Sequence, residues 1–340
     1  MPTTVVKSIG TNSRDYSTLQ SWEDACPANL VSADQIWKGE CYNDSEFTAG
    51  VTISGQTTDS TRYVWLTAAA GHSFKDHANV RTNALAYNVS NGVGVHWDAS
   101  GNGSTVDVTA AHTRIDRLQI KRSGGGNYSV TRAAALLQSR IDSCIVDFSV
   151  ATNGVFRYAL YLNNAVASNC VVVCRNETRG IYLSEASSAI NCTVIAITVS
   201  NLGVTAAYSG TAGLGLRNCA LFGFSTAPDG TFDADSDYNA TDLSSGLPGA
   251  NSLHSCSFAA CFENTATDFR LKAGSPLIDA GNTDATYAPN DISGTARGSG
   301  LDGDIGAWEY TSGGGGGGGV IEPFIRARRP GVTWINDRGA

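Results

Sequence analysis

Four short phrases between residues 142 and 221 each place a cysteine after a polar residue and before an apolar or β-branched run. They read DSCIV (142–146), SNCVV (168–172), INCTV (190–194) and RNCAL (217–221). An earlier phrase, RIDRL (114–118), aligns without a gap to RIDSC (140–144). The steps from Leu118 through Cys144, Cys170 and Cys192 to Cys219 are 26, 26, 22 and 27 residues. A near-constant period of this length indicates a repeat architecture.

Each repeat is too short for a helical hairpin but long enough for two or three short strands. A polar turn residue followed by β-branched residues is typical of a turn that leads into a strand. Strands that recur once per coil stack as a parallel ladder, about 4.8 Å apart. Equivalent inward positions then form a column, which suits cysteine because a buried thiol behaves as a small hydrophobe. We therefore predict an all-β, right-handed parallel β-helix with an interior column. Its members are Leu118, Cys144, Cys170, Cys192 and Cys219.

The remaining segments are organised around this solenoid. Residues 1–34 form a predicted N-terminal cap, because Leu19, Trp22 and Ala25 share one face of a short helix that begins at Asp15 or Ser17. Residues 35–311 form the predicted β-helix. A cap of this kind would protect the open end of the solenoid, where unpaired strand edges otherwise invite aggregation.

The C-terminal part of the chain has a different composition. Residues 312–319 include seven consecutive glycines and are typical of a flexible linker. Residues 320–340 are too few to fold alone, yet they keep apolar, aromatic and arginine side chains. We predict that this peptide docks onto another protein. The predicted docking residues are Ile321, Phe324, Ile325, Arg326, Arg328, Arg329 and Trp334.

Composition excludes several classes of function. The net charge of −8 argues against nucleic acid as a partner, because a phosphate backbone needs a basic surface. No stretch of 18 apolar residues predicts a membrane span, and the N-terminus lacks the pattern of a signal peptide. The nine cysteines are an odd number without zinc-type spacing, so we expect buried free thiols. No cofactor is predicted.

Several stretches resemble pectate-lyase-like β-helix proteins of bacteria and phages, over residues 12–310. The stretches are RDYSTLQSW (14–22), YVWLTAAAGH (63–72), SPLIDAG (275–281), DISGTAR (291–297) and DIGAWE (304–309). Together with the tethered peptide and the missing signal peptide, the resemblance implies a virion protein of a tailed bacteriophage, made in the host cytoplasm. Its expected role is structural and non-catalytic, as a capsid decoration or tail fibre bound to other virion proteins. A homo-oligomer is expected, with a trimer as one closed symmetric form.

Two alternatives follow from the same resemblance, since this architecture supports unrelated functions. One is a carbohydrate-active enzyme, either a polysaccharide lyase or a depolymerase, with Asp116 and Asp142 as register-matched carboxylates. Against it, Asp and Asn commonly fill turn positions and cap local backbone N–H groups. The other alternative is an adhesin that binds a host surface glycan without cleaving it.

Two further groups of residues leave alternatives open. Asp233, Asp235 and Asp237 alternate as in the start of a calcium loop, but the required glycine and the final glutamate are missing, so solvated turns are favoured over a metal site. Tyr158, Tyr161 and Tyr182 are compatible either with a ladder that stacks against sugar rings or with positions that face the core.

Overall fold

The computed structural model describes residues 1–76, 83–98, 103–123, 131–133, 138–148, 158–175, 179–198, 207–209, 214–282, 289–298 and 302–311. The chain divides into two compact units, Met1–Tyr310 and Thr311–Ala340. Of the second unit only Thr311 is described, so the predicted linker and every predicted docking residue from 321 to 334 lie outside the described residues.

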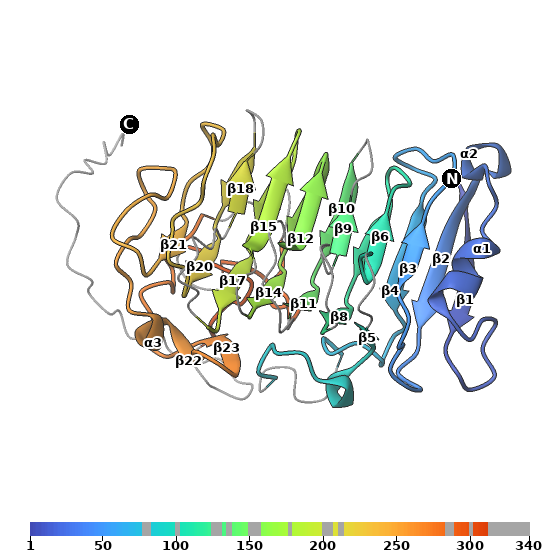
Figure 1. Ribbon diagram of the computed structural model, residues 1–340, viewed down its shortest axis with the longest axis horizontal. Helices are drawn as coiled ribbons and strands as arrows, with labels where there is room; N and C mark the ends of the chain where they lie inside the picture. The colour runs from blue at the N-terminus through green and yellow to red at the C-terminus, as the bar shows by residue number, and fades with distance from the viewer. Residues whose placement is uncertain are drawn as a thin grey trace, which may run out of the picture. The chain divides into compact units, whose positions relative to one another are not determined.

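Three parallel sheets make up most of the first unit (Figure 1). The described strands of the first sheet are, in spatial order, β1 (Thr3–Ile9), β2 (Gln35–Cys41), β4 (Val64–Ala68), β7 (Arg114–Asp116), β10 (Ser139–Asp142), β13 (Ala165–Ser168), β16 (Ser188–Ile190) and β19 (Gly215–Arg217). Those of the second sheet are β5 (Gly94–Trp97), β8 (Gln119–Arg122), β11 (Ile145–Phe148), β14 (Val171–Cys174), β17 (Thr193–Ala196), β20 (Ala220–Phe222) and β21 (Ala240–Thr241). Those of the third sheet are β3 (Val51–Ile53), β6 (Val106–Val108), β9 (Thr131–Ala133), β12 (Tyr158–Asn163), β15 (Arg179–Ser184) and β18 (Ala207–Ser209).

The order of these strands defines a parallel β-helix. From β7 to β20 each coil contributes one strand to the first sheet, the next to the second and the next to the third, so that every one of these strands pairs with its equivalent one coil away. The gapless alignment of the repeats is confirmed, because Arg114 pairs with Arg140, Ile115 with Ile141 and Asp116 with Asp142. The right-handed sense of the coils stays a prediction from the rule for parallel crossovers.

A single residue in the left-handed backbone conformation makes the bend between the first and second sheets. The φ angles are 59° at Arg117, 50° at Ser143, 51° at Asn169, Asn191 and Asn218, and 56° at Tyr238. Asparagine visits this region more readily than most residues, which accounts for the Asn–Cys phrases of the sequence. The residue after each bend turns inward. These residues are Leu118, Cys144, Cys170, Cys192, Cys219 and Asn239, and each is fully buried.

The inward thiols contact one another along the column. Cys170 neighbours both Cys144 and Cys192, and Cys192 neighbours Cys219; burial, with a contribution from these neighbouring thiols, raises the pKa of Cys170 and of Cys219. Each thiol also lies close to a carbonyl two residues back in its own coil, as in Cys170 Sγ to Ser168 O at 3.2 Å. All nine cysteines of the chain are free thiols. The column continues to Asn239, whose side-chain amide donates to Leu216 O at 2.8 Å and accepts from Cys219 N at 2.9 Å.

Short helices lie outside the sheets. They are α1 (Leu19–Asp24), α2 (Leu30–Ala33), the 3-10 turn η2 (Val89–Asn91) and α3 (Phe258–Cys261). Helix α1 contacts β1 and β3 and buries Leu19 and Trp22. Its N-cap is Thr18, which accepts from Ser21 N at 3.0 Å, so the assignment to Asp15 or Ser17 was wrong. That α1 protects the open end of the solenoid stays a prediction. Within the described residues no helix is both long and apolar enough to span a bilayer.

From β11 to β21 the second sheet is buried on both faces. Its inward residues belong to the interior core, whereas outward residues such as Ile145, Val171 and Ile195 belong to a second apolar cluster. The segment 258–310, which includes the antiparallel pair β22 (Phe262–Asn264) and β23 (Asp268–Leu271), supplies most of the cover. Burial on both faces explains why β14 is a continuous apolar run.

Candidate functional site

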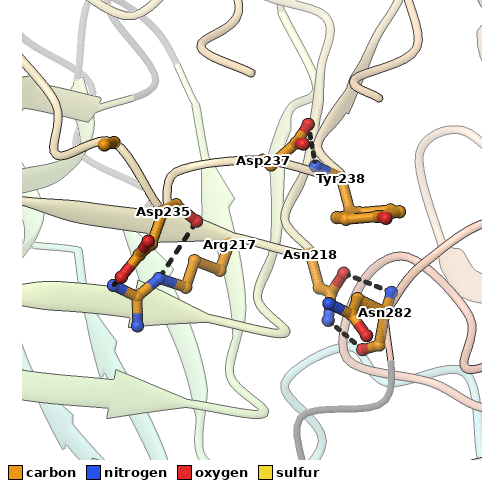
Figure 2. Close-up of a pocket in the computed structure, with 7 residues that line it drawn as sticks. Arg217, Asn218, Asp235, Asp237, Tyr238 and Asn282 are labelled. Carbon is orange, nitrogen blue, oxygen red and sulfur yellow. Dashed lines mark hydrogen bonds and ion pairs between the residues drawn. The ribbon is translucent and has the colours of Figure 1, made fainter. Parts of the chain in front are cut away.

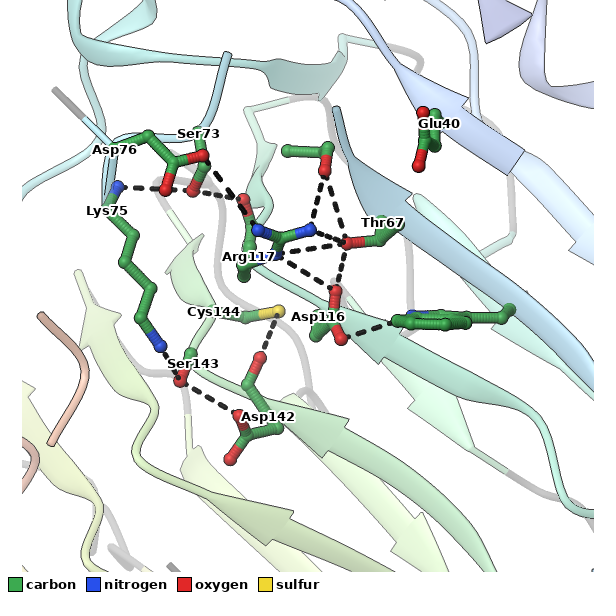
Figure 3. A network of polar contacts seen from close by, with 12 residues as sticks. Glu40, Thr67, Ser73, Lys75, Asp76, Asp116, Arg117, Asp142, Ser143 and Cys144 are labelled. Carbon is green, nitrogen blue, oxygen red and sulfur yellow. Dashed lines mark hydrogen bonds and ion pairs between the residues drawn. The ribbon is translucent and has the colours of Figure 1, made fainter. Parts of the chain in front are cut away.

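The outer face of the first sheet carries two parallel columns of side chains. One column runs through Lys38, Trp65, Arg114 and Arg140, and the other runs through Glu40, Thr67, Asp116, Asp142 and Ser168. Both columns follow from the strand register, which places equivalent residues about 4.8 Å apart on successive coils. The second column contains the two carboxylates that the sequence singled out, and Figure 3 shows them with their neighbours.

Asp116 is enclosed by donors from the preceding coil. Trp65 Nε1 donates to Asp116 Oδ2 at 3.1 Å, and Thr67 Oγ1 donates to Asp116 Oδ1. The guanidinium of Arg117 lies 3.6 Å away, from Nε to Asp116 Oδ1. Burial raises the pKa of Asp116, while Thr67, Arg117 and Trp65 oppose this rise and the neighbouring Asp142 adds to it.

Asp142 is bonded mainly to the following coil. Its Oδ1 accepts from Ser168 Oγ at 2.5 Å and from Asn169 Nδ2 at 3.3 Å, and its Oδ2 accepts from Ser143 Oγ at 2.9 Å. These partners are side chains, as are those of Asp116. The expectation that the two aspartates cap local backbone N–H groups was therefore wrong, because the strand register brings hydroxyls of adjacent coils within hydrogen-bond distance of both carboxylates.

The nearby cations are also bonded to the protein. Arg117 Nη2 donates to Ala68 O at 2.9 Å and to Thr67 Oγ1 at 3.1 Å, and Lys75 Nζ lies 3.5 Å from Ser143 Oγ (Figure 3). Such an arrangement holds adjacent coils together on the outside. It offers acid–base chemistry only if a substrate displaces Thr67 from Asp116, whose pKa is raised by burial.

The three aspartates of the calcium alternative, Asp233, Asp235 and Asp237, bond to different partners. Arg217 Nη2 lies 3.1 Å from Asp233 Oδ2 and 3.5 Å from Asp235 Oδ2, whereas Asp237 accepts from the backbone and side chain of Asn251. Across the described ranges no group of three or more His, Cys, Asp or Glu side chains is placed to hold a metal ion.

The tyrosines of the third sheet stack on one another. Tyr161 and Tyr182 pair in register on β12 and β15, with ring centroids 4.8 Å apart and an interplanar angle of 13°. Tyr158 is 7% exposed and lies 4.7 Å from Tyr182 between ring centroids. The facing sides of Tyr161 and Tyr182 cover each other, so those two sides are closed to a sugar ring.

Beside the bend at Asn218 the structure contains a pocket that the sequence did not predict (Figure 2). Its volume is about 390 Å³. The lining residues are Arg217, Asn218, Ala234, Asp235, Asp237, Tyr238 and Asn282. Of the residues that line this pocket, the sequence pattern singled out only the alternating aspartates. Nothing in the repeat pattern placed Tyr238 at a bend or Asn282 beside it.

The strand pairing thus defines the class of the protein as a parallel β-helix. No protein-family model and no curated protein sequence matches the chain. Among solved structures, the crystal structure of pectate lyase Pel9A is similar over 92% of this chain and 97% of that one, with 12% identity and a TM-score of 0.32. A similarity this low does not indicate an activity. The fold is assigned from the strand register alone.

Proposed function

We propose that this chain is a non-catalytic structural protein of a tailed bacteriophage virion. In this proposal the β-helix is displayed on the capsid or tail, and residues 320–340 attach it to other virion proteins. The observation that carries the proposal is the division of the chain at Tyr310, immediately before the run of glycines. Tyr310 N donates to Asp304 Oδ2 at 2.5 Å and Glu309 N to Asp291 Oδ2 at 2.9 Å, so the first unit closes on itself before the linker begins.

A second observation supports a passive role for the solenoid. Asp116 and Asp142 are bonded to side chains of adjacent coils, so they stabilise the stacking of the coils. A catalytic carboxylate would instead have to keep an oxygen available to the substrate. We further propose that the protein is synthesised in the host cytoplasm and forms a closed homo-oligomer such as a trimer, which analytical ultracentrifugation would detect.

Deletion of residues 313–340 tests the attachment. The truncated protein should keep its circular dichroism spectrum and melting temperature but should no longer co-sediment with particles in a sucrose gradient. A full-length Phe324→Ala/Trp334→Ala variant should be lost in the same way, whereas the control Glu322→Gln should remain bound. Retention of the truncated protein on particles would overturn the attachment mechanism.

A polysaccharide lyase or depolymerase is the second candidate function. The raised pKa of the half-buried Asp116, one coil from Asp142, is the observation that favours it. Reducing-end and unsaturated-product assays on bacterial polysaccharides test it, with Asp116→Asn, Asp142→Asn and the exposed control Asp229→Asn. If the unmodified protein and the Asp229→Asn control cleave a polysaccharide, and Asp116→Asn and Asp142→Asn do not, the protein is an enzyme and the structural role is refuted. Binding without turnover would indicate an adhesin.

A further inference from the structure

The pocket beside Asn218 is formed by three segments of the chain. Tyr238 occupies the same bend position as Asn218 one coil earlier, and its φ of 56° turns the side chain outward at the seam between the first and second sheets. Asn282 lies opposite, held by its backbone: Asn218 Nδ2 donates to Asn282 O at 2.5 Å and Asn282 N donates to Asn218 Oδ1 at 2.8 Å. The segment that covers the second sheet thus supplies one wall.

The Asp237 and Arg217 side chains of the pocket wall are already held by bonds within the protein. Asp237 Oδ1 accepts from Asn251 N at 2.8 Å and its Oδ2 accepts from Asn251 Nδ2 at 2.7 Å. Arg217 Nε donates to Asp235 O at 3.2 Å, and its Nη2 lies 3.1 Å from Asp233 Oδ2. A ligand would therefore bind without freezing these side chains, which lowers the entropic cost of association.

Several polar groups at the pocket retain hydrogen-bonding capacity. Within the described residues, Arg217 Nη1, the side-chain amide of Asn282 and the hydroxyl of Tyr238 have no hydrogen-bond partner. The carboxylate of Asp235 is 83% exposed. The pocket therefore presents donors and acceptors together, next to one aromatic ring (Figure 2).

The signs of the charges restrict the ligand. A cation would meet the guanidinium of Arg217, and an anion would meet the carboxylates of Asp235 and Asp237. A neutral ligand rich in hydroxyl groups can use both kinds of partner, because each hydroxyl donates and accepts. Its C–H faces can pack on the apolar face of Tyr238, and a volume of about 390 Å³ falls within the range of small-molecule sites. We propose that this pocket binds one or two neutral sugar residues.

This inference does not depend on how the chain is anchored, so a failed deletion experiment leaves it intact. Ligand-observed saturation-transfer NMR on the full-length protein would screen methyl glycosides of glucose, galactose and N-acetylglucosamine, with glucuronic acid and glucosamine as charged comparisons. Isothermal titration calorimetry would then measure the dissociation constant of any sugar that binds. Affinity for a neutral sugar should change little when salt is raised from about 0.05 to 0.5 M, since screening acts on charged ligands.

Three variants test the residues. Tyr238→Asn keeps a residue that tolerates the left-handed bend but removes the ring, and it should weaken binding about tenfold. Asn282→Ala leaves the backbone bonds to Asn218 in place, and Asp235→Asn removes one exposed carboxylate; each should weaken binding about two- to tenfold. Asp229→Asn, an exposed aspartate outside the pocket lining, is the matched control and should bind like the unmodified protein.

Three results would overturn the inference. These are the absence of saturation transfer to every neutral sugar in the panel, tighter binding of a charged sugar, and affinity that survives Tyr238→Asn and Asn282→Ala together. Melting temperatures of the variants show whether a loss of binding reflects unfolding. If Tyr238→Asn alone melts early, the Asn282→Ala and Asp235→Asn variants decide the outcome, because both leave the backbone hydrogen bonds of these residues in place.

Discussion

Replacing Arg297 by alanine should release the segment that covers the second sheet. The guanidinium is buried, and its Nη2 donates to Asn169 Oδ1 at 2.9 Å and to Gly306 O at 2.8 Å. Its Nη1 lies 3.6 Å from Glu309 Oε2, and the two side chains are only 3% and 2% exposed. Arg297 therefore joins the C-terminal segment to a bend of the solenoid and neutralises a buried carboxylate.

The loss of stability in Arg297→Ala depends on the environment of the Glu309 carboxylate once the guanidinium is removed. Burial already raises the pKa of Glu309, and without Arg297 its carboxylate has lost its close cation. Removing one partner of a buried ion pair typically costs about 3–5 kcal/mol. Since the pair is so little exposed, solvent screening does not reduce this figure much. Local release of the segment limits the loss, however, because the solenoid can stay folded when its cover opens. We expect a loss of about 3 kcal/mol, confined to the cover.

Native-state hydrogen exchange read by mass spectrometry separates local from global opening. The amides of Ile292, Gly306 and Ala307 bond to Ala307 O, Asn218 O and Thr193 Oγ1 at 2.9, 2.8 and 2.9 Å. Their exchange should speed up about a hundredfold in the Arg297→Ala variant, since each 1.4 kcal/mol is a factor of ten. The amide of Val171, which bonds to Cys144 O at 3.0 Å between coils, should keep its rate.

Arg270→Ala is the matched control, because that guanidinium pairs with Asp268 at the edge of the same segment and both side chains are more exposed, at 22% and 18%. Its loss should cost less than about 1 kcal/mol. Unchanged exchange at Ile292 and Ala307 in Arg297→Ala would refute the reasoning. Equal acceleration at Val171 would refute it too, because the cover and the solenoid would then unfold as one.

Three further predictions concern pH, the thiol column and the tyrosines. Burial raises the pKa of Asp304 from 3.8 to about 7, so the folded state holds this proton more tightly than the unfolded state. The resulting stability is fully present below about pH 4 and is lost as pH rises to about 7, so Asp304→Asn should flatten the fall in melting temperature between about pH 4 and pH 7. Cys192→Ala should lower the free energy of unfolding by about 1 kcal/mol in urea, more than Cys26→Ala at a half-buried site; equal losses would contradict a close-packed column. A double-mutant cycle on Tyr161 and Tyr182 should give a coupling of about 0.5–1.5 kcal/mol, and a coupling near zero would show that the stack does not stabilise the third sheet.

The periodicity of the chain was enough to predict the coil. Because every coil repeats the same bend and the same inward position, the spacing of Cys144, Cys170, Cys192 and Cys219 already identified residues that share one column. The gapless match of RIDRL to RIDSC already specified the register of Asp116 with Asp142. Stacking of equivalent positions is a local, periodic constraint, and periodic constraints are visible in one dimension.

The contacts on the outside of the coils could not be predicted from this periodicity. Strand β14 is buried on both faces, but no periodicity in the sequence pointed to segment 258–310 as its cover. In the same way, Thr67 and Ser168 became partners of the two aspartates only through strand register, and the pocket required Tyr238 and Asn282 to meet across the chain. Such contacts join segments that do not repeat, so the physical information that selects them is shape and charge in three dimensions.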